Sequence, residues 1–254
     1  MKLHVVEDGP LTAPIVVLLH SLALDGSVWR YVVPTIAEHS RTLTIDLRGH
    51  GQSPPDADFT VEDMADDVAA VIRDHGGGRA VTVVGLSLGG CVAQSVAVRH
   101  PNLVSGLVLA DTTAWYGEDA PSAWRNRAEQ ARSDGLVSLS RFQLERWFSD
   151  EFRLANAELC ADLLDRFTSN DLDAYAATCR ALGAYDGRGR VESITVPTEI
   201  VVGEHDGATP PADAYDLAER ILGAHVTVLP GAKHLTALER PDALCDAILR
   251  VVNF

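Results

Sequence analysis

Three residues of the types that together perform covalent hydrolysis, a serine, an acid and a histidine, occur at Ser87, Asp206 and His234. A serine hydroxyl is a poor nucleophile at neutral pH, so it needs a general base within hydrogen-bond reach and an acid that orients this base. We therefore predict Ser87 as the nucleophile, His234 as the general base and Asp206 as the acid.

Ser87 lies in the segment Gly85-Leu86-Ser87-Leu88-Gly89, a G-x-S-x-G pattern with an apolar run before it and small residues after it. The apolar run at 80–84 is typical of a buried parallel strand. The small residues that follow, among them Gly90, predict a slim helix whose first turn packs close to this strand. Such a strand, turn and helix would hold the serine at the tip of a sharp turn.

Asp206 and His234 also follow apolar runs that predict strands, at 200–202 and at 226–229. The carboxyl ends of parallel strands meet at one edge of a sheet, where their loops form a common crevice. We therefore expect all three side chains to meet at that edge.

Other residues near these strand ends offer alternative roles. Asp111 also ends a predicted strand and is the alternative acid, whereas His205, beside Asp206, is the alternative base. His20 and His50 are expected to be structural, with hydrogen bonds to the backbone of their loops. No group of residues has the spacing of metal ligands, so we expect no metal and no other cofactor.

Acyl transfer also requires two preorganised donors for the oxyanion of the tetrahedral intermediate. The backbone N–H of Leu88, which follows the nucleophile, is the first predicted donor. The second is the N–H of Leu22, in the loop that leaves the strand at 15–19. Both assignments depend on position in the chain, because a backbone donor leaves the side chain free to vary.

Short apolar runs alternate with helical patterns along most of the chain. We expect strands at 15–19, 42–47, 81–84, 107–110, 200–202 and 226–229. Between the second and third of these, a helical pattern at 61–72 begins after Thr60, with Asp63 placed for a capping box. This alternation predicts an α/β fold with a mostly parallel sheet flanked by helices.

The alternation stops after Asp111, and no strand pattern occurs before Val196. Helical spacing occurs instead at 136–146, 159–167 and 172–182. We therefore predict a core made of residues 1–113 and 191–254, with a helical cap at 114–190 inserted before the penultimate strand.

The composition excludes several classes of protein. The 254 residues carry 36 acidic and 21 basic side chains and a formal net charge of −15. Such a charge argues against nucleic acid or an anionic membrane as a partner. The first residues contain no long apolar run, so we expect a cytoplasmic protein. The four cysteines are scattered and are expected to be buried free thiols.

The chain resembles the α/β-hydrolases over its whole length and, more narrowly, the 3-oxoadipate enol-lactonases of bacterial aromatic degradation. The broad resemblance is carried by Asp46-Leu47-Arg48-Gly49-His50-Gly51-Gln52-Ser53, Gly85-Leu86-Ser87-Leu88-Gly89-Gly90, Gly203 with Asp206 and Thr209-Pro210-Pro211, and His234 with Glu239-Arg240-Pro241. The narrower resemblance is carried by Ser21-Leu22, Leu109-Ala110-Asp111-Thr112-Thr113-Ala114 and Glu145-Arg146-Trp147-Phe148. The order serine, acid, histidine is also that of α/β-hydrolases.

One departure concerns the predicted oxyanion loop. Where these lactonases tend to have Asn-Ser-Leu-Gly, the chain has His20-Ser21-Leu22-Ala23. In this segment the chain is more similar to general esterases.

The resemblance also implies substrate-binding residues in the cap. An enol-lactone with a free carboxylate needs a positive partner, and the resemblance implies Arg146 for this role, with Trp147 as a wall of the pocket. Arg125 and Trp124 form a second pair of this kind. In the alternative interpretation Arg146 pairs with a cap carboxylate and Trp147 belongs to the cap core.

The resulting hypothesis is a cofactor-free serine hydrolase that opens the enol-lactone of 3-oxoadipate through an acyl-enzyme. Its expected partner is a small ester or lactone, anionic in the leading case, and a homo-oligomer is compatible with the sequence. With the same triad, the alternatives are a carboxylesterase, another lactonase, a carbon–carbon bond hydrolase or a cofactor-free perhydrolase. A ligand-binding receptor or sensor on a hydrolase fold is the alternative from a different class.

Overall fold

One mixed sheet forms the centre of the molecule. The computed structural model describes residues 1–56 and 58–252. The strands of the described residues are β1 (Val5–Asp8), β2 (Ile15–Leu19), β3 (Arg41–Ile45), β4 (Val81–Leu86), β5 (Val104–Ala110), β6 (Thr198–Gly203) and β7 (His225–Leu229). Their order is β1-β3-β2-β4-β5-β6-β7, and only the pairing of β1 with β3 is antiparallel. The mostly parallel sheet predicted from the sequence is therefore confirmed.

The strand predictions differ from the structure mainly at the ends of the elements. The central strands β2 and β4 are buried along their whole length, as expected for apolar runs covered on both faces. The strand expected at 42–47 ends at Ile45, because the N–H of Leu47 turns away to the side chain of His20. Strand β1 was not predicted, since this short edge strand is mostly exposed and lacks a continuous apolar run.

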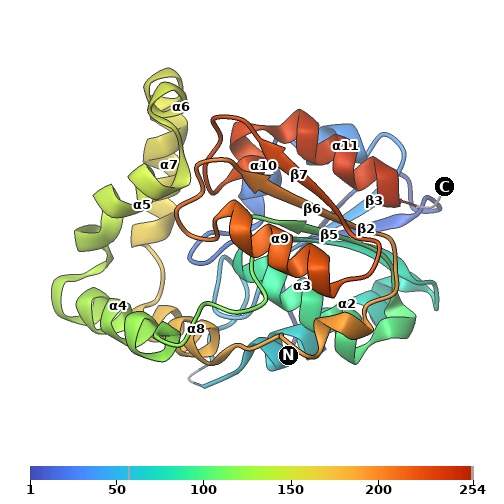
Figure 1. Ribbon diagram of the computed structural model, residues 1–254, viewed down its shortest axis with the longest axis horizontal. Helices are drawn as coiled ribbons and strands as arrows, with labels where there is room; N and C mark the ends of the chain where they lie inside the picture. The colour runs from blue at the N-terminus through green and yellow to red at the C-terminus, as the bar shows by residue number, and fades with distance from the viewer. Residues whose placement is uncertain (57, 253–254) are drawn as a thin grey trace.

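Helices cover both faces of the sheet (Figure 1). The core helices are α1 (Val33–Ile36), α2 (Val61–Gly76), α3 (Leu88–Arg99), α9 (Pro211–Arg220), α10 (Thr236–Glu239) and α11 (Pro241–Val251). In Figure 1, α11 lies on one face of the sheet, and α2 and α3 lie on the opposite face. The predicted capping box of α2 is present, since Thr60 and Asp63 each accept the other's backbone N–H. The helix ends at Gly77, in the left-handed conformation with a φ of 57°.

The segment between β5 and β6 is helical, as predicted. It contains α4 (Ala120–Asp134), the 3₁₀ helix η3 (Leu136–Leu139), α5 (Ser140–Trp147), α6 (Asp150–Ala155), α7 (Ala157–Thr168) and α8 (Leu172–Ala184). These helices form a separate group beside one edge of the sheet in Figure 1. The division into a core of 1–113 and 191–254 and a cap of 114–190 stays a prediction, and residue 254 lies outside the described residues.

Aromatic rings form part of the interior of the cap. Trp147 on α5 contacts Phe167 on α7 edge to face, with ring centroids 5.7 Å apart, and Phe167 in turn contacts Tyr175 on α8 at 6.0 Å. These contacts join α5, α7 and α8 through edge-to-face pairs of rings.

The chemistry of the cysteines agrees with the sequence prediction. All four are buried and free, at Cys91, Cys160, Cys179 and Cys245. Burial raises the pKa of Cys91 to about 11, which leaves its thiol protonated at neutral pH. Along the described residues, no helix has the length and apolar character that a bilayer crossing requires.

Candidate active site

The structure brings the predicted nucleophile, base and acid into one chain of hydrogen bonds. Ser87 Oγ lies 2.9 Å from His234 Nε2, and His234 Nδ1 lies 2.8 Å from Asp206 Oδ2. All three side chains are buried. The imidazole can therefore donate to the aspartate through Nδ1 and accept the serine proton at Nε2, which is the arrangement that serine hydrolysis requires.

Ser87 occupies a strained turn between β4 and α3. Its φ of 56° and ψ of −112° are unusual for a residue with a Cβ atom. The turn is possible only because its neighbours are small: a Cβ atom on Gly85 would clash with the carbonyl group of Gly89, and one on Gly89 would clash with that of Leu19. The predicted close approach of α3 to the sheet is confirmed, and it leaves the Ser87 hydroxyl exposed to the base.

Asp206 is held as an anion by donors of its own loop. Its Oδ1 accepts the N–H groups of Ala208 at 2.6 Å and Thr209 at 3.1 Å, and its Oδ2 accepts the Thr209 hydroxyl at 2.9 Å. Burial by itself would raise the pKa of Asp206, but the neighbouring His234 and these donors outweigh burial and lower it. The carboxylate is therefore fixed in the position from which it orients the imidazole.

Asp111 lies close to the triad but does not replace its acid. Its carboxyl group is fully buried and accepts the N–H of Gly203 at 3.1 Å and both the N–H and the hydroxyl of Thr236, at 2.9 and 2.6 Å. Burial and the charge of Asp206 raise the pKa of Asp111 well above its usual range. Gly203 precedes the loop of Asp206 and Thr236 follows His234, so Asp111 ties these two loops together.

The remaining histidines take no part in the triad. His205, the alternative base, is exposed and its ring faces Glu204 at 3.9 Å. His20 contacts the carbonyl of the next residue through Nδ1 and accepts the N–H of Leu47 at Nε2, at 2.8 and 2.9 Å, which defines a neutral ring. Burial lowers the pKa of His50 to about 3, and its Nδ1 lies 2.9 Å from a backbone carbonyl. The structural role expected for His20 and His50 agrees with these contacts.

The two predicted oxyanion donors lie on segments that are hydrogen-bonded to each other. Leu88 is the first residue of α3, and the N–H of Gly89 beside it donates to the carbonyl of His20 at 3.1 Å. This bond places the loop with Leu22 against the first turn of the helix. Among the described residues, neither the Leu22 N–H nor the Leu88 N–H has a protein acceptor, as expected of donors kept for a ligand. Their role stays a prediction.

A small cavity lies between the triad and the cap. Its volume is about 30 Å³, and it is lined by Ser87, His234 and Leu22 from the core and by Arg146 and Trp147 from the cap. This volume holds about two water molecules. The cavity shares Arg146 and other lining residues with an open groove of about 650 Å³ between α4 and α5. A ligand can therefore approach the triad through this groove, provided that the side chains between them move.

Arg146, predicted to bind substrate, does line the cavity, and its guanidinium lies over the ring of Phe142 at 5.2 Å. Burial and the nearby charge of Arg127 lower the pKa of Arg146. Within the described residues, it forms no ion pair with a carboxylate, and the adjacent Glu145 pairs with Arg141 instead. The described residues therefore contradict the alternative in which Arg146 pairs with a cap carboxylate.

The basic partner of Trp124 was identified incorrectly from the sequence. Trp124 lines the cavity, but Arg125 is exposed, and the second cavity arginine is Arg127. Arg127 Nε donates to the Tyr175 hydroxyl at 2.7 Å, and its guanidinium lies 5.2 Å from the centre of the Trp124 ring. The spacing of three residues from Trp124 places Arg127 on the same helix face, a signal that was available in the sequence.

Gln143 was missed as a cavity residue. It lies three residues before Arg146 on α5, is buried, and lines the cavity. Its Oε1 has no hydrogen-bond partner among the described residues. Because buried polar atoms are normally paired, this oxygen points to a ligand or water that completes it.

Trp147 combines both roles considered for it. It lines the cavity, and it also packs against Phe148 and Phe167 inside the cap.

The described residues contain no cluster of three or more histidine, cysteine or acidic side chains placed to hold a metal ion.

The chain is similar to known proteins over nearly its whole length. Residues 14–241 match the family model described as the alpha/beta hydrolase fold. The 3-oxoadipate enol-lactonase 1 of Acinetobacter baylyi is 30% identical over 92% of this chain and 87% of its own length. The pimeloyl-[acyl-carrier protein] methyl ester esterase of Sodalis glossinidius is 28% identical over 91% of each chain.

Among solved structures, the enol-lactonase from Burkholderia xenovorans LB400 superposes with a TM-score of 0.92 at 33% identity, covering 98% of this chain and 95% of that one. The family model covers most of the sequence, and the relatives match it nearly end to end. The chain therefore belongs to the α/β-hydrolase family and is similar to its enol-lactonases and esterases.

Proposed function

We propose that the protein hydrolyses a small anionic ester or lactone through an acyl-enzyme on Ser87, with the enol-lactone of 3-oxoadipate as its substrate. One observation carries this proposal: the triad faces a cavity whose cap side presents two arginines without a carboxylate partner in the described residues, Arg127 and Arg146. The names of the relatives support the choice of an enol-lactone.

In the first half of the reaction, His234 takes the proton of the Ser87 hydroxyl as its oxygen attacks the lactone carbonyl carbon. The charge on the carbonyl oxygen is received by the N–H groups of Leu22 and Leu88. The ring C–O bond then breaks, and His234 returns its proton to the departing enolate oxygen. An enolate is an easy leaving group, so this step needs no metal.

In the second half, a water molecule attacks the acyl-enzyme while His234 accepts one of its protons. The tetrahedral intermediate uses the same two N–H donors, and its collapse returns the proton to Ser87 Oγ. The released product carries a new carboxylate, and its enol end becomes a ketone. Asp206 keeps the imidazole in place through both halves and stays ionised, as its lowered pKa favours.

Recognition of the substrate is assigned to the cap. The free carboxylate of an enol-lactone would pair with Arg146 or Arg127, and such charge-assisted hydrogen bonds are stronger than neutral ones. The amide of Gln143 lies on the same side and has an unused acceptor. In a protein with a net charge of −15, these local cations are what would attract an anionic substrate.

A second candidate is the methyl ester of a longer acyl chain. Two observations favour it: the groove of about 650 Å³ that adjoins the catalytic cavity, and the similarity to a pimeloyl-[acyl-carrier protein] methyl ester esterase. In this case the acyl chain would lie along the groove between α4 and α5, with its ester group beside Ser87.

The experiment that tests the proposal follows the disappearance of enzymatically generated enol-lactone by absorbance. We expect rapid decay with the wild-type protein and the uncatalysed rate with Ser87→Ala, and equal rates would overturn the proposal. A series of methyl esters and p-nitrophenyl esters of increasing length, each with and without a terminal carboxylate, separates the two candidates. Labelling of Ser87 by a fluorophosphonate tests the alternative of a receptor, which would leave the serine unreacted.

A further inference from the structure

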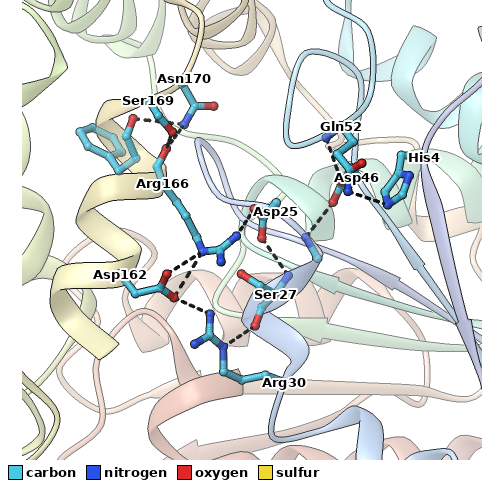
Figure 2. Close-up of polar contacts among 12 residues, drawn as sticks. His4, Asp25, Ser27, Arg30, Asp46, Gln52, Asp162, Arg166, Ser169 and Asn170 are labelled. Carbon is cyan, nitrogen blue, oxygen red and sulfur yellow. Dashed lines mark hydrogen bonds and ion pairs between the residues drawn. The ribbon is translucent and has the colours of Figure 1, made fainter. Parts of the chain in front are cut away.

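A second contact between the cap and the core involves the segment that contains Leu22. Here the C-terminal end of α7 and the residues that follow it reach the segment after β2 (Figure 2). Residues of both segments line a groove of about 810 Å³. This core segment contains Leu22 and continues into the 3₁₀ helix η1 (Gly26–Trp29). The loop that is predicted to supply an oxyanion donor is therefore held from the cap.

The first link is the side-chain amide of Asn170. Its Nδ2 donates to the carbonyl of Ala23 at 2.8 Å, and it also lies 2.8 and 3.1 Å from the carbonyls of Arg166 and Phe167. The last two contacts are with carbonyl groups in the last turn of α7. The same amide thus ends the cap helix and binds the core loop.

Ala23, the residue bound by Asn170, has an unusual backbone. Its φ is 57°, in the left-handed region that residues with a Cβ atom rarely adopt. It is fully buried and directly follows Leu22. A backbone of this kind persists only when its surroundings hold it, and Asn170 supplies a hydrogen bond to its carbonyl group.

The second link is a network of charged side chains, shown in Figure 2. Arg166 Nη1 donates to Asp25 Oδ2 at 2.7 Å, and Asp25 Oδ1 accepts the N–H of Ser27 at 2.9 Å as the N-cap of η1. On the cap side, Asp162 accepts from Arg166 at 3.3 Å and from Arg30 at 2.8 Å. Each pair is partly exposed, but four linked charges hold the start of η1 against α7.

We infer that Asn170 and Arg166 are positioning residues, through which the seated cap helix α7 holds the Leu22 loop in the conformation that completes the oxyanion hole. The inference rests on the proposed function, because it matters only if the Leu22 N–H receives the oxyanion. Its consequence is that the hole is complete only while the cap lies on the core. Closure over a substrate would then assemble the catalytic site as well as exclude water.

The test compares steady-state kinetics of Asn170→Ala and wild type on an ester that the wild type hydrolyses. We expect kcat to fall about tenfold with KM changed by less than about twofold, since a displaced oxyanion donor acts on the transition state. The matched control is Asn156→Ala: Asn156 caps α6 by donating to the carbonyl of Phe152 at 2.9 Å, inside the cap. Its kcat should equal that of wild type.

A suppressor variant separates positioning from general support of the fold. Glycine adopts a positive φ without strain, so in an Ala23→Gly background the loop needs Asn170 less. In this background, Asn170→Ala should lower kcat by about threefold or less, compared with about tenfold in the wild type. A double-mutant cycle measures this coupling between the two positions. An unchanged loss in the Ala23→Gly background, or an equal loss with Asn156→Ala, would overturn the inference.

Arg166→Ala provides an independent measurement if Asn170→Ala does not fold. We expect the same pattern of lowered kcat and near-constant KM, with Arg132→Ala as control, because the ion pair of Arg132 within the described residues is with the exposed Asp173 of the cap, at 2.8 Å. End-point labelling of Ser87 by a fluorophosphonate distinguishes the two levels of failure. If the wild type neither labels nor turns over, the proposed function and this inference both fall, whereas an active wild type with unaffected variants overturns this inference alone.

Discussion

The two walls of the catalytic cavity differ in how their polar groups are satisfied. On the core wall, Ser87 and His234 are hydrogen-bonded to each other, and the imidazole is held by a carboxylate with its own donors. On the cap wall, the Gln143 oxygen is buried without a partner, and Arg127 and Arg146 face the cavity without a carboxylate in the described residues. The catalytic side chains of the core wall are paired before a ligand binds, which suits them to perform a reaction, whereas the open polar side chains of the cap wall are suited to choose the substrate.

The largest expected effect comes from removing the nucleophile of the core wall. We expect Ser87→Ala to lower kcat on any ester substrate by at least about 10⁴-fold and to abolish labelling by a fluorophosphonate. Rates on anionic and neutral esters should fall alike, because the core wall acts on the reacting bond. Ser133→Ala, which changes an exposed serine of the cap, is the control and should retain full activity.

The two buried carboxyl groups of the core wall provide the next test. Asp206→Asn is expected to lower kcat by about 10⁴-fold, because the amide favours the wrong tautomer of His234. Asp111→Asn should lower kcat by less than about tenfold and lower the free energy of unfolding by about 1 to 3 kcal/mol, since it disturbs a buried hydrogen-bond network. Kinetics and chemical denaturation measure these changes, and an equal loss of kcat in both variants would reassign the acid.

The cap wall should respond only to the charge of the substrate. We expect Arg146→Met to lower kcat/KM by about 10- to 100-fold for esters with a free carboxylate, because a charge-assisted hydrogen bond is lost. Neutral p-nitrophenyl esters should change by less than about threefold, since methionine keeps most of the side-chain volume. An equal loss with charged and neutral esters would mean that Arg146 supports the cap and does not select substrate.

The smallest expected effect is a loss of stability in mild acid, which we attribute to the buried side chain of His50. The pKa of His50 is lowered to about 3 in the folded protein, so below the ordinary value of 6.5 the unfolded chain binds a proton that the folded one rejects. Stability is therefore complete above pH 6.5 and falls as the pH decreases. Between pH 6.5 and 5.5 the protonation of this histidine in the unfolded chain should lower the free energy of unfolding by about 1 kcal/mol.

Urea denaturation at several pH values measures this slope. His50→Gln should flatten it, whereas His205→Gln, which changes an exposed ring, should leave it unchanged. The same slope in His50→Gln and wild type would show that other groups cause the acid sensitivity.

Local patterns were sufficient to predict most of the core. The central strands are buried on both faces, so their apolar runs are continuous and easily recognised, and the glycines around Ser87 have no alternative that fits the space. Strand β1 was missed because a short edge strand with an exposed face carries little apolar signal. The cap was predicted as helical, but its second basic residue was predicted as Arg125, the chain neighbour of Trp124, whereas Arg127, three residues on and therefore on the same helix face, lines the cavity.

By itself, the sequence determined which residues could perform hydrolysis: a serine on a glycine-bounded turn, with an acid and a histidine at two later strand ends. These assignments depend on neighbours in the chain and on the convergence of parallel strands at one edge. Only the tertiary structure decided which cap side chains face Ser87. It also decided that Asn170, just after α7, binds the loop of Leu22 through the carbonyl of Ala23. Contacts between residues about 150 positions apart leave no periodic trace in a single sequence, because they arise from how packed elements meet.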